Sequence, residues 1–382
     1  MRQIVCISTA PWYPIPTRKQ QVMQRLSDCE VLYFDPPVTY LAPLKDREAK
    51  EKLRAWRKPG EKPAPHVTVY ATPPVLPFFN KFRWINRINQ KKLARFVGKK
   101  LREHGFSAPL LWCYSPTSCD LIAHVEHRGL VYDCVDRHSA YGGLMDPALV
   151  DAMELELAAK SDAVFATAEG LAQRLREANP ETRFIPNGAD FERFHAASEP
   201  QPLPEDFPAI DGSVFGFVGA LQTCIAYDYI EYAAQQRPDW HFVFIGGEKP
   251  GAALSLLKTL PNCHFLGLKP NKQLPQYMAR FDVCLNLFAD SDLSADVSPL
   301  KFFEYLATGK PIVSTRQPKQ TLQYADVIQI ASDPEDFVRQ CEIALQDAAP
   351  ARCAARIECG RSCSWDSRVE EIRNCLKEKN LL

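Results

Sequence analysis

A lysine and a glutamate three residues apart are the residues in this sequence whose types and spacing best suit chemistry. Lys301 and Glu304 lie in the segment 294–315, SADVSPLKFFEYLATGKPIVST. An ammonium can neutralise a phosphate, and a carboxylate can accept two hydrogen bonds from a ribose diol. The spacing places both side chains on one side of a helix. The same spacing fits an ordinary surface ion pair, which contributes about 0.3–0.5 kcal/mol. Spacing alone therefore does not decide between a ligand-binding pair and an ordinary ion pair.

The helix that carries this pair is expected to follow a strand at 283–289. Ser298 is the predicted N-cap, Pro299 suits the first turn, and Gly309 ends the helix. In a parallel sheet such a helix begins at the carboxyl ends of the strands, where ligands bind. Its free N–H groups and the positive end of its dipole attract phosphates. The segment therefore predicts a clamp for a nucleoside diphosphate.

A second group of candidates belongs to the strand expected at 129–136, GLVYDCVD. Side chains alternate along a strand, so Asp133 and Asp136 point to opposite faces and one of them can face a cleft. Asp136, nearer the tip, is the preferred general base. His138 is the alternative, because an unperturbed imidazole pKa of about 6.5 suits proton transfer. A role of both aspartates as caps of loops or of the next helix remains open here.

These candidates lie on two series of buried apolar runs. Strands are expected at 3–9, 31–37, 109–115, 129–136, 163–168 and 183–188, and again at 213–221, 241–247, 263–268, 283–289 and 310–315. Helix-length segments fill most gaps, which is typical of doubly wound parallel α/β sheets. We predict two Rossmann-like domains that face each other across a cleft, 1–195 and 209–360, with a Pro-rich linker at 196–208. The terminal helix, 361–382, is expected to return to the first domain.

Composition narrows the possible partners. The chain has 382 residues, 46% of them hydrophobic, enough for two cores. Residues 1–150 carry 23 Lys/Arg against 13 Asp/Glu, and the rest carry 23 against 33, so the first part is +10 and predicts an anionic partner. Thirteen cysteines without a CxxC pair fit a reducing cytosol. No metal is expected, and the DSD at 290–292 is interpreted as a polar loop. No apolar run reaches the roughly 18 residues of a membrane span.

The segment 81–102, KFRWINRINQKKLARFVGKKLR, has nine Lys/Arg and no acidic residue. Its apolar residues form one helical stripe, made of Phe82, Ile85, Ile88, Leu93, Phe96, Val97 and Leu101. A basic amphipathic helix after the apolar loop 71–80 predicts contact with an anionic membrane surface, although an ordinary helix with a solvated basic face also fits. The residues expected on this membrane and acceptor side are Phe82, Arg83, Trp84, Lys91, Lys92, Lys99 and Lys100. Nucleic acid is disfavoured, because no stacking platform accompanies the charge.

The segment SPLKFFEYLATGKPIVST resembles the signature of group 1 glycosyltransferases of the GT-B fold, whose EX7E motif ends in the glutamate that holds the donor ribose. Asp296 replaces the first Glu, eight residues before Glu304. Further blocks, in order and spacing, are similar to bacterial enzymes of exopolysaccharide and teichuronic acid synthesis: RKQQVMQRL (18–26), VYDCVDRHSAY (131–141), SDAVFATAEGLAQRL (161–175), FIPNGADFERF (184–194), FGFVGAL (215–221), PDWHFVFIG (238–246) and FLGLKPNKQLPQYMARFDVCL (265–285).

The resemblance implies a nucleotide-sugar donor in the second domain and an acceptor in the first, with no metal or other cofactor. The donor-binding residues it implies are Gly219, Asp296, Ser298, Lys301 and Glu304. Gly219 would let the backbone approach the diphosphate, and Lys301 would offset the charge of the leaving group. Asp136 resembles the base of inverting xanthan-type glucuronosyltransferases, whereas the Asp296/Glu304 pattern points to retention, so the stereochemistry stays open.

The expected protein is a cytoplasmic glycosyltransferase, peripheral on the inner face of the plasma membrane. It would move a sugar from a nucleoside diphosphate, most simply UDP, to a polyprenyl-diphosphate-linked saccharide in bacterial surface polysaccharide synthesis. Two alternatives are a GT-B nucleotide-sugar epimerase and a catalytically degenerate subunit that binds nucleotide sugar. Asp136 and the Lys301/Glu304 pair argue against degeneracy.

Overall fold

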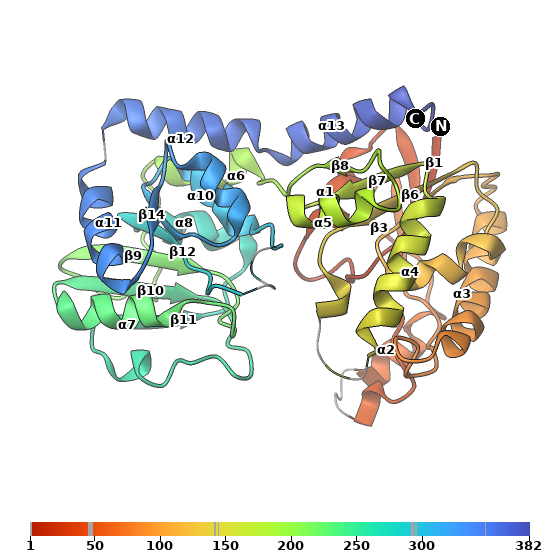
Figure 1. The fold of residues 1–382 in the computed structure, drawn as a ribbon, viewed down its shortest axis with the longest axis horizontal. Coiled ribbons are helices and arrows are strands. Elements are labelled where there is room, and N and C mark those ends of the chain that lie inside the picture. Colours follow the sequence, from red (N-terminus) through yellow and green to blue (C-terminus); the bar gives the residue numbers. More distant parts are fainter. Residues whose placement is uncertain are drawn as a thin grey trace. The chain divides into compact units, whose positions relative to one another are not determined.

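The computed structural model describes residues 2–44, 49–140, 143, 145–291, 294, 296–347 and 349–382. The chain divides into two α/β units, each built on one sheet (Figure 1). Unit 1 comprises Met1–Pro186 and Val369–Leu382, and unit 2 comprises Asn187–Arg368. The proline-rich segment 196–208, expected as a linker, lies within unit 2, because Ala197 and Phe207 pack into the core of that unit.

Unit 1 has an eight-stranded sheet in the order β3-β4-β2-β1-β5-β6-β7-β8, parallel except between β3 and β4. The strands are β1 (Arg2–Ile7), β2 (Cys29–Phe34), β3 (Glu61–Ala64), β4 (Val67–Tyr70), β5 (Leu110–Cys113), β6 (Gly129–Cys134), β7 (Ala163–Ala166) and β8 (Arg183–Phe184). The six predicted strands are all present, and β3 and β4 were not predicted. The helices are α1 (Arg18–Arg25), α2 (Ala49–Ala55), α3 (Arg83–Glu103), α4 (Pro147–Lys160) and α5 (Glu169–Arg176).

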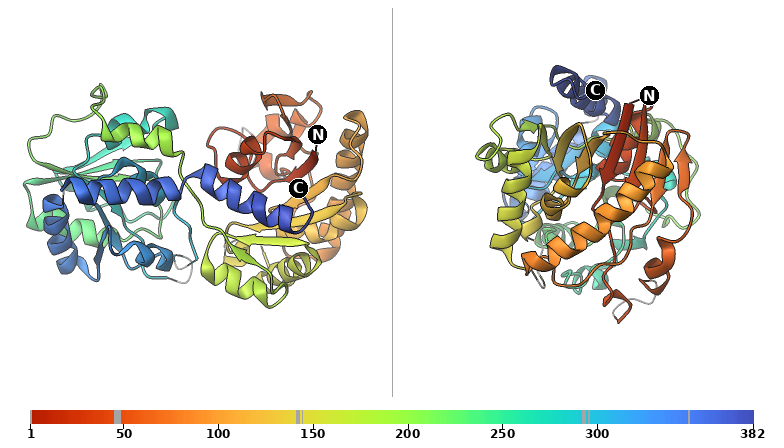
Figure 2. Two further views of the ribbon diagram at one scale, coloured as in Figure 1. Left: turned by 90° about the horizontal axis from the view of Figure 1, so that it is seen from above. Right: turned by 90° about the vertical axis from the view of Figure 1, so that its right-hand side faces the viewer.

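Helices cover both faces of this sheet, which explains its nearly continuous apolar strands. In β5, Leu111 and Cys113 join the core beneath α3, α4 and α5. Leu110 and Trp112 join the opposite core, beneath α1 and the last helix, α13 (Trp365–Glu378). From Val369 onward α13 belongs to unit 1. The two chain ends lie side by side in every view, with α13 in dark blue and β1 in red (Figure 2).

Unit 2 has a six-stranded, fully parallel sheet in the order β11-β10-β9-β12-β13-β14. The strands are β9 (Ser213–Val218), β10 (Trp240–Ile245), β11 (Cys263–Gly267), β12 (Val283–Asn286), β13 (Ile312–Thr315) and β14 (Gln329–Ala331), of which only β14 was not predicted. The helices are α6 (Phe191–His195), α7 (Tyr227–Gln236), α8 (Leu274–Met278), α10 (Leu300–Thr308), α11 (Pro334–Gln346) and α12 (Pro350–Ser362). One core lies beneath α7 and α11, and the other beneath α6, α8, α10 and α12.

Each sheet reverses its strand order at one point. In unit 1 the chain builds outward from β1 through β2 and then returns to place β5 on the other side of β1. In unit 2 it builds outward from β9 and then returns to place β12 beside β9. Ligands of doubly wound sheets bind outside the carboxyl ends of the strands at such switch points, so these two positions are the candidate ligand sites.

Candidate functional site

The switch point of unit 2 brings together two elements that the sequence had singled out. Gly219 directly follows β9, and the segment after β12 leads into α10. The N-cap of α10 is Pro299, so the predicted cap Ser298 is wrong by one residue. The Oγ of Ser298 instead accepts a hydrogen bond from the backbone N–H of Asn187 at 3.1 Å. Gly309, with φ of 72°, ends the helix as predicted.

Two glycines keep the carboxyl ends of β9 and β10 in direct backbone contact. The N–H of Gly219 donates to the carbonyl of Ile245 at 2.9 Å. Gly246 has a φ of 157°, and a Cβ there would lie 1.7 Å from the carbonyl oxygen of Gly219. No side chain fits at Gly246 without separating the two strands. The edge of the sheet at this point is therefore bare backbone, which a bulky anion can approach closely.

Lys301 and Glu304 form an ion pair in the first turns of α10. The ammonium lies 2.6 Å from Oε2 of Glu304, whose side chain is only 9% exposed, and 5.6 Å from the ring centre of Phe194. Burial raises the pKa of Glu304, and the nearby Lys301 and Arg193 oppose this shift. This is not the fully solvated pair of the ordinary interpretation, because the carboxylate is largely removed from water. A ligand that binds both groups would have to replace contacts that they now make with each other.

Asp296 lies in a turn ahead of α10 and is half-buried. The pattern that it forms with Glu304 therefore spans a turn and a helix. Asp290 accepts a hydrogen bond from Nε2 of Gln317 at 2.7 Å, whereas Asp292 of the DSD lies outside the described residues. Among the residues that are described, no group of three or more His, Cys, Asp or Glu is placed to hold a metal ion.

A cavity of about 550 Å³ lies at the carboxyl edge of the unit 2 sheet. It is lined by residues that follow β12 and β13, by the start of α7 and by neighbours of these segments: Ala226, Asp228, Tyr229, Phe288, Ala289, Asp290, Thr315, Arg316, Gln317, Lys319, Leu322 and Ser332. Its size falls within the range of small-molecule sites. Arg316 and Lys319 are exposed and give it positive charge.

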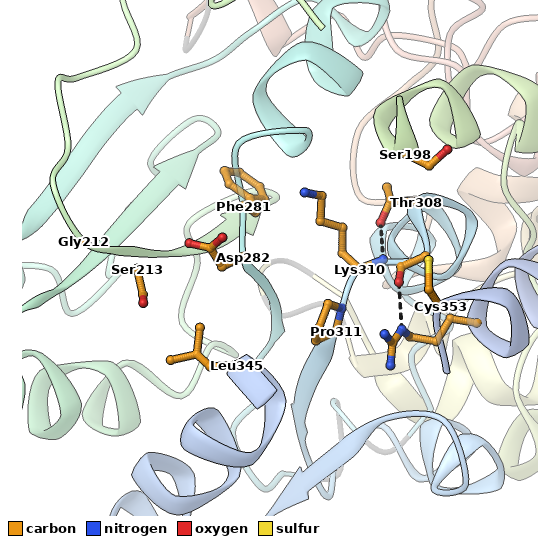
Figure 3. A pocket seen from close by; sticks show the side chains of 12 residues that line it. Ser198, Gly212, Ser213, Phe281, Asp282, Thr308, Lys310, Pro311, Leu345 and Cys353 are labelled. Atoms are coloured by element: carbon orange, nitrogen blue, oxygen red, sulfur yellow. Dashed lines mark hydrogen bonds between the residues drawn. The ribbon is translucent and has the colours of Figure 1, made fainter. Parts of the chain in front are cut away.

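A second cavity of unit 2, about 520 Å³, lies at the opposite, amino edge of the sheet (Figure 3). Its cations are engaged within the protein. The ammonium of Lys310 donates to the carbonyl of Ala279 at 3.0 Å, and Nε of Arg356 donates to the carbonyl of Gly309 at 2.8 Å. Because ligands of doubly wound sheets bind at the carboxyl edge, this cavity is not the candidate site.

In unit 1 the two aspartates of β6 and its following loop have different environments. Asp133 is fully buried and accepts two hydrogen bonds from Nε of Arg18, at 2.9 and 3.0 Å. Nη1 of Arg18 also donates to the carbonyls of Ile185 and Pro186. Asp133 is therefore part of a buried structural ion pair. Asp136 is half-buried beyond the carboxyl end of β6 and is the one of the two that a substrate can reach.

The electrostatic surroundings of Asp136 include His138 and a lysine that the sequence did not single out. Burial lowers the pKa of His138, against the opposing effects of Glu154 and Asp136. Burial also lowers the pKa of Lys19, and the strongest opposing effect comes from Asp136. Lys19 was missed because RKQQVMQRL indicates only the start of a helix, and nothing local shows that its second residue is buried.

The helix α3 contains the predicted basic segment, but most of its apolar stripe faces the core of unit 1. Ile85, Leu93, Val97 and Leu101 are buried beneath it. Phe82, Trp84 and Ile88 are exposed, by 43, 61 and 49%. None of the helices that the structure describes is long and apolar enough to cross a bilayer.

The basic residues predicted for the membrane side fall into two groups. Arg83 pairs with Asp120 at 3.0 Å and with Glu156 at 2.5 Å. Lys92 donates to the hydroxyl of Tyr40, and Lys100 pairs with Glu103. Lys91 is exposed, and Lys99 is exposed beside Glu103. The exposed positive charge on α3 is instead carried by Arg87, Lys91, Arg95, Lys99 and Arg102. Three of these residues, Arg87, Arg95 and Arg102, were not among those predicted for the membrane side.

Residues 212–347 match the family model of glycosyl transferases group 1. The chain is 27% identical over 260 residues to the Bacillus subtilis (strain 168) protein described as "Putative teichuronic acid biosynthesis glycosyltransferase TuaH". That match covers 64% of this chain and spans 65% of the length of that relative.

Solved structures resemble the whole chain. Sucrose-phosphate synthase from Thermosynechococcus elongatus has a TM-score of 0.71 at 15% identity, and Anabaena HepE in complex with UDP and glucose has a TM-score of 0.66 at 14% identity. Each comparison covers 99% of both chains. At these identities the likeness establishes the fold, two Rossmann-like units of the GT-B type, and confirms the fold class predicted from the sequence.

Proposed function

We propose that this chain, which has the GT-B fold, is a group 1 glycosyltransferase that transfers a sugar from a uridine diphosphate to a saccharide carried on a polyprenyl diphosphate, in the synthesis of a bacterial surface polysaccharide. The observation that carries the proposal is the switch point of unit 2, where the first turn of α10, the Lys301–Glu304 pair and the bare backbone at Gly219 meet the carboxyl edge of the sheet.

The donor would bind in unit 2. The N-terminus of α10 and Lys301 attract the diphosphate, and Glu304 accepts hydrogen bonds from the ribose diol. The paired glycines at the ends of β9 and β10 let the diphosphate lie against the backbone. In the transition state, negative charge grows on the leaving diphosphate. The ammonium of Lys301 and the dipole of α10 stabilise this charge. Ser298 holds the segment that leads into α10 through its hydrogen bonds with Asn187, and Asp296, in the turn ahead of it, is a further proposed donor-binding residue.

The acceptor would bind in unit 1, with Asp136 as the general base and His138 as the alternative. In the inverting course, the acceptor oxygen forms a bond to the anomeric carbon as its proton passes to the Asp136 carboxylate. The bond from the anomeric carbon to the diphosphate oxygen breaks, and its electron pair leaves with the UDP. The anomeric configuration of the product, read by NMR, distinguishes this course from retention.

Isothermal titration of UDP, GDP, ADP and CMP without added metal tests the donor site. We expect UDP to bind best and Glu304→Ala to weaken it by about tenfold or more, the worth of charge-assisted hydrogen bonds. Glu342→Ala is the matched control, because Glu342 is also ion-paired on a helix of unit 2, with Arg237 at 2.7 Å. Equal UDP affinity in the wild type and Glu304→Ala would refute the clamp.

The pH dependence of UDP affinity gives an independent check. Burial raises the pKa of Glu304 and Lys301 lowers it, and only the carboxylate can accept both ribose hydrogen bonds. The affinity for UDP should therefore fall as the pH drops through this pKa. Lys301→Met removes the effect that lowers the pKa of Glu304, so the UDP affinity of this variant should fall at a higher pH than that of the wild type.

Transfer of radiolabelled sugar from UDP-glucose to a bacterial lipid extract separates a transferase from a protein that only binds nucleotide.

We place the acceptor at a membrane surface because unit 1 exposes an apolar rim beside accessible basic residues. The apolar rim comprises Tyr40, Leu41, Leu76, Phe78, Phe82, Trp84 and Ile88. Backbone bonds hold its segments together: Leu76 bonds to Asn89 through both its N–H and its carbonyl, and Tyr40 N–H donates to Val75. Arg87, Lys91 and Arg95 on α3 add charge of the sign that anionic lipids attract.

Co-sedimentation with vesicles of phosphatidylglycerol and phosphatidylcholine tests this contact. We expect the wild type to pellet with anionic vesicles and Trp84→Ser/Lys91→Glu to remain in the supernatant, since both the apolar and the charged contributions are reduced. Lys377→Glu is the control, because Lys377 is exposed on α13, which packs on the opposite face of the sheet from α3. Equal pelleting of all three proteins would refute the membrane assignment and leave the donor site untouched.

A further inference from the structure

Lys19 occupies the switch point of unit 1. It is the second residue of α1, which begins after the loop that follows β1. Its ammonium lies 5.7 Å from the ring centre of Tyr114, the residue that follows β5. The cation therefore lies across the carboxyl ends of β1 and β5, the two strands between which the order of this sheet reverses. A doubly wound sheet binds its ligand in this crevice.

The side chain of Lys19 is buried, yet its ammonium has no hydrogen-bond or ion-pair partner in the described part of unit 1. Lys19 is only 7% exposed, and the one interaction of its ammonium is a cation–π contact with the Tyr114 ring. Asp133, the buried carboxylate nearby, is taken by Arg18. Asp136 acts on Lys19 through space and forms no ion pair with it. A buried charge is costly unless it is paired, so this arrangement calls for a ligand.

Two more donors beside Lys19 are also unused within the described residues. Nη2 of Arg18 and the hydroxyl of Tyr114 are buried and have no hydrogen-bond partner. The other atoms of the Arg18 guanidinium are bonded to Asp133 and to the carbonyls of Ile185 and Pro186. Three unused donors therefore lie together at this switch point, and the N-terminus of α1 adds the positive end of its dipole.

We propose that Lys19 binds a phosphate group of a substrate. A phosphate supplies the negative charge that Lys19 lacks and an acceptor oxygen for the hydroxyl of Tyr114. The choice of phosphate, rather than another anion, rests on the proposed function, which offers two sources: the diphosphate of the nucleotide sugar and the diphosphate of the lipid-linked acceptor. With a phosphate bound, Lys19 also holds positive charge beside Asp136, the proposed base.

Titration with inorganic pyrophosphate tests the site directly. The background chain is Lys301→Met, so that α10 contributes little to binding. In this chain we expect Lys19→Met to weaken pyrophosphate at least tenfold, the effect of losing a charge-assisted hydrogen bond, and Lys19→Arg to keep most of the affinity. Lys160→Met, a lysine with 51% exposure on the same unit, is the matched control and should bind as the background does.

Unchanged pyrophosphate affinity in Lys19→Met, or no binding at all by the Lys301→Met background, would overturn the proposal. Circular dichroism and Tm accompany each variant, and Lys19→Gln replaces Lys19→Met if the latter fails to fold. Parallel titrations with UDP and with farnesyl diphosphate in micelles identify the source of the phosphate. The source is the ligand whose affinity falls in the Lys19→Met variant. Failure of the proposed function itself would show separately, as loss of the Glu304-dependent binding of UDP.

Discussion

The contrast between Asp133 and Asp136 yields a quantitative prediction. Asp133→Ala leaves the guanidinium of Arg18, 2% exposed, without its carboxylate. Removing one partner of a buried ion pair costs about 3–5 kcal/mol, since the remaining charge stays buried and unpaired. For a unit of this size, each kcal/mol corresponds to a Tm shift of about 2–4 °C. We therefore expect Asp133→Ala to lower the Tm of unit 1 by about 6–20 °C.

Asp136→Ala should behave in the opposite way. Asp136 is half-buried and forms no ion pair within the described residues, so its removal should cost only about 1 kcal/mol, mainly the electrostatic support that it gives to the buried Lys19. Its effect should fall on sugar transfer, because it is the proposed base. Differential scanning calorimetry gives the Tm values, and sugar transfer is measured well below both transitions so that unfolding does not mimic a catalytic loss.

A double variant separates the ion pair from the aspartate itself. Arg18→Met/Asp133→Leu contains no buried charge at these positions and should be more stable than Asp133→Ala. Its recovery should be partial, because Arg18 also donates to the carbonyls of Ile185 and Pro186. If Asp133→Ala kept the wild-type Tm and lost turnover while Asp136→Ala stayed active, the assignment of structural and catalytic roles would be reversed.

Two further predictions concern Asp35 and Gly246. Burial raises the pKa of Asp35 to about 6, above its unfolded value, so its ionisation penalises folding increasingly from about pH 4 to pH 6. Asp35→Asn keeps an acceptor for the N–H of Trp12. In urea unfolding it should stabilise the protein by about 2–3 kcal/mol more at pH 8 than at pH 4. An equal effect at the two pH values would contradict the raised pKa. Gly246→Ala, whose Cβ would meet the carbonyl of Gly219, should cost about 1–3 kcal/mol and weaken UDP binding. Gly247→Ala, whose Cβ meets nothing within 4 Å, should do neither, and similar losses in both would contradict the packing argument.

The strands that were predicted are those whose local signal is strong. The sequence of β5 is a continuous apolar run, because all four of its residues are buried between the layers of helices. By contrast β3 contains Pro63 and has no buried residue, as suits an edge strand, and β14 has only three residues. The end of α10 at Gly309 could be predicted because a positive φ is a local property of glycine.

The parts of the site that were not predicted depend on residues far apart in the chain. Ser298 fails to cap α10 because Asn187, 111 residues away, takes its hydroxyl. The spacing of apolar residues predicted α3, but this spacing is the same whether the apolar stripe faces a protein core or a membrane. Lys19 has no ion-pair partner because Asp133 already pairs with Arg18, a contact between residues 115 positions apart. Spacing within one helix carries no information about such competition.

The return of α13 to unit 1 bears on the order in which the protein can be made. Val369, Ile372 and Leu376 are buried against strands that leave the ribosome more than 200 residues earlier, among them β1. Unit 2 is contiguous and can complete its sheet during translation. Until the final helix emerges, unit 1 has one apolar face that only α1 covers in part. A nascent chain stopped before Val369 is therefore expected to bind holdase chaperones through that face, even though the whole of its eight-stranded sheet has already been synthesised.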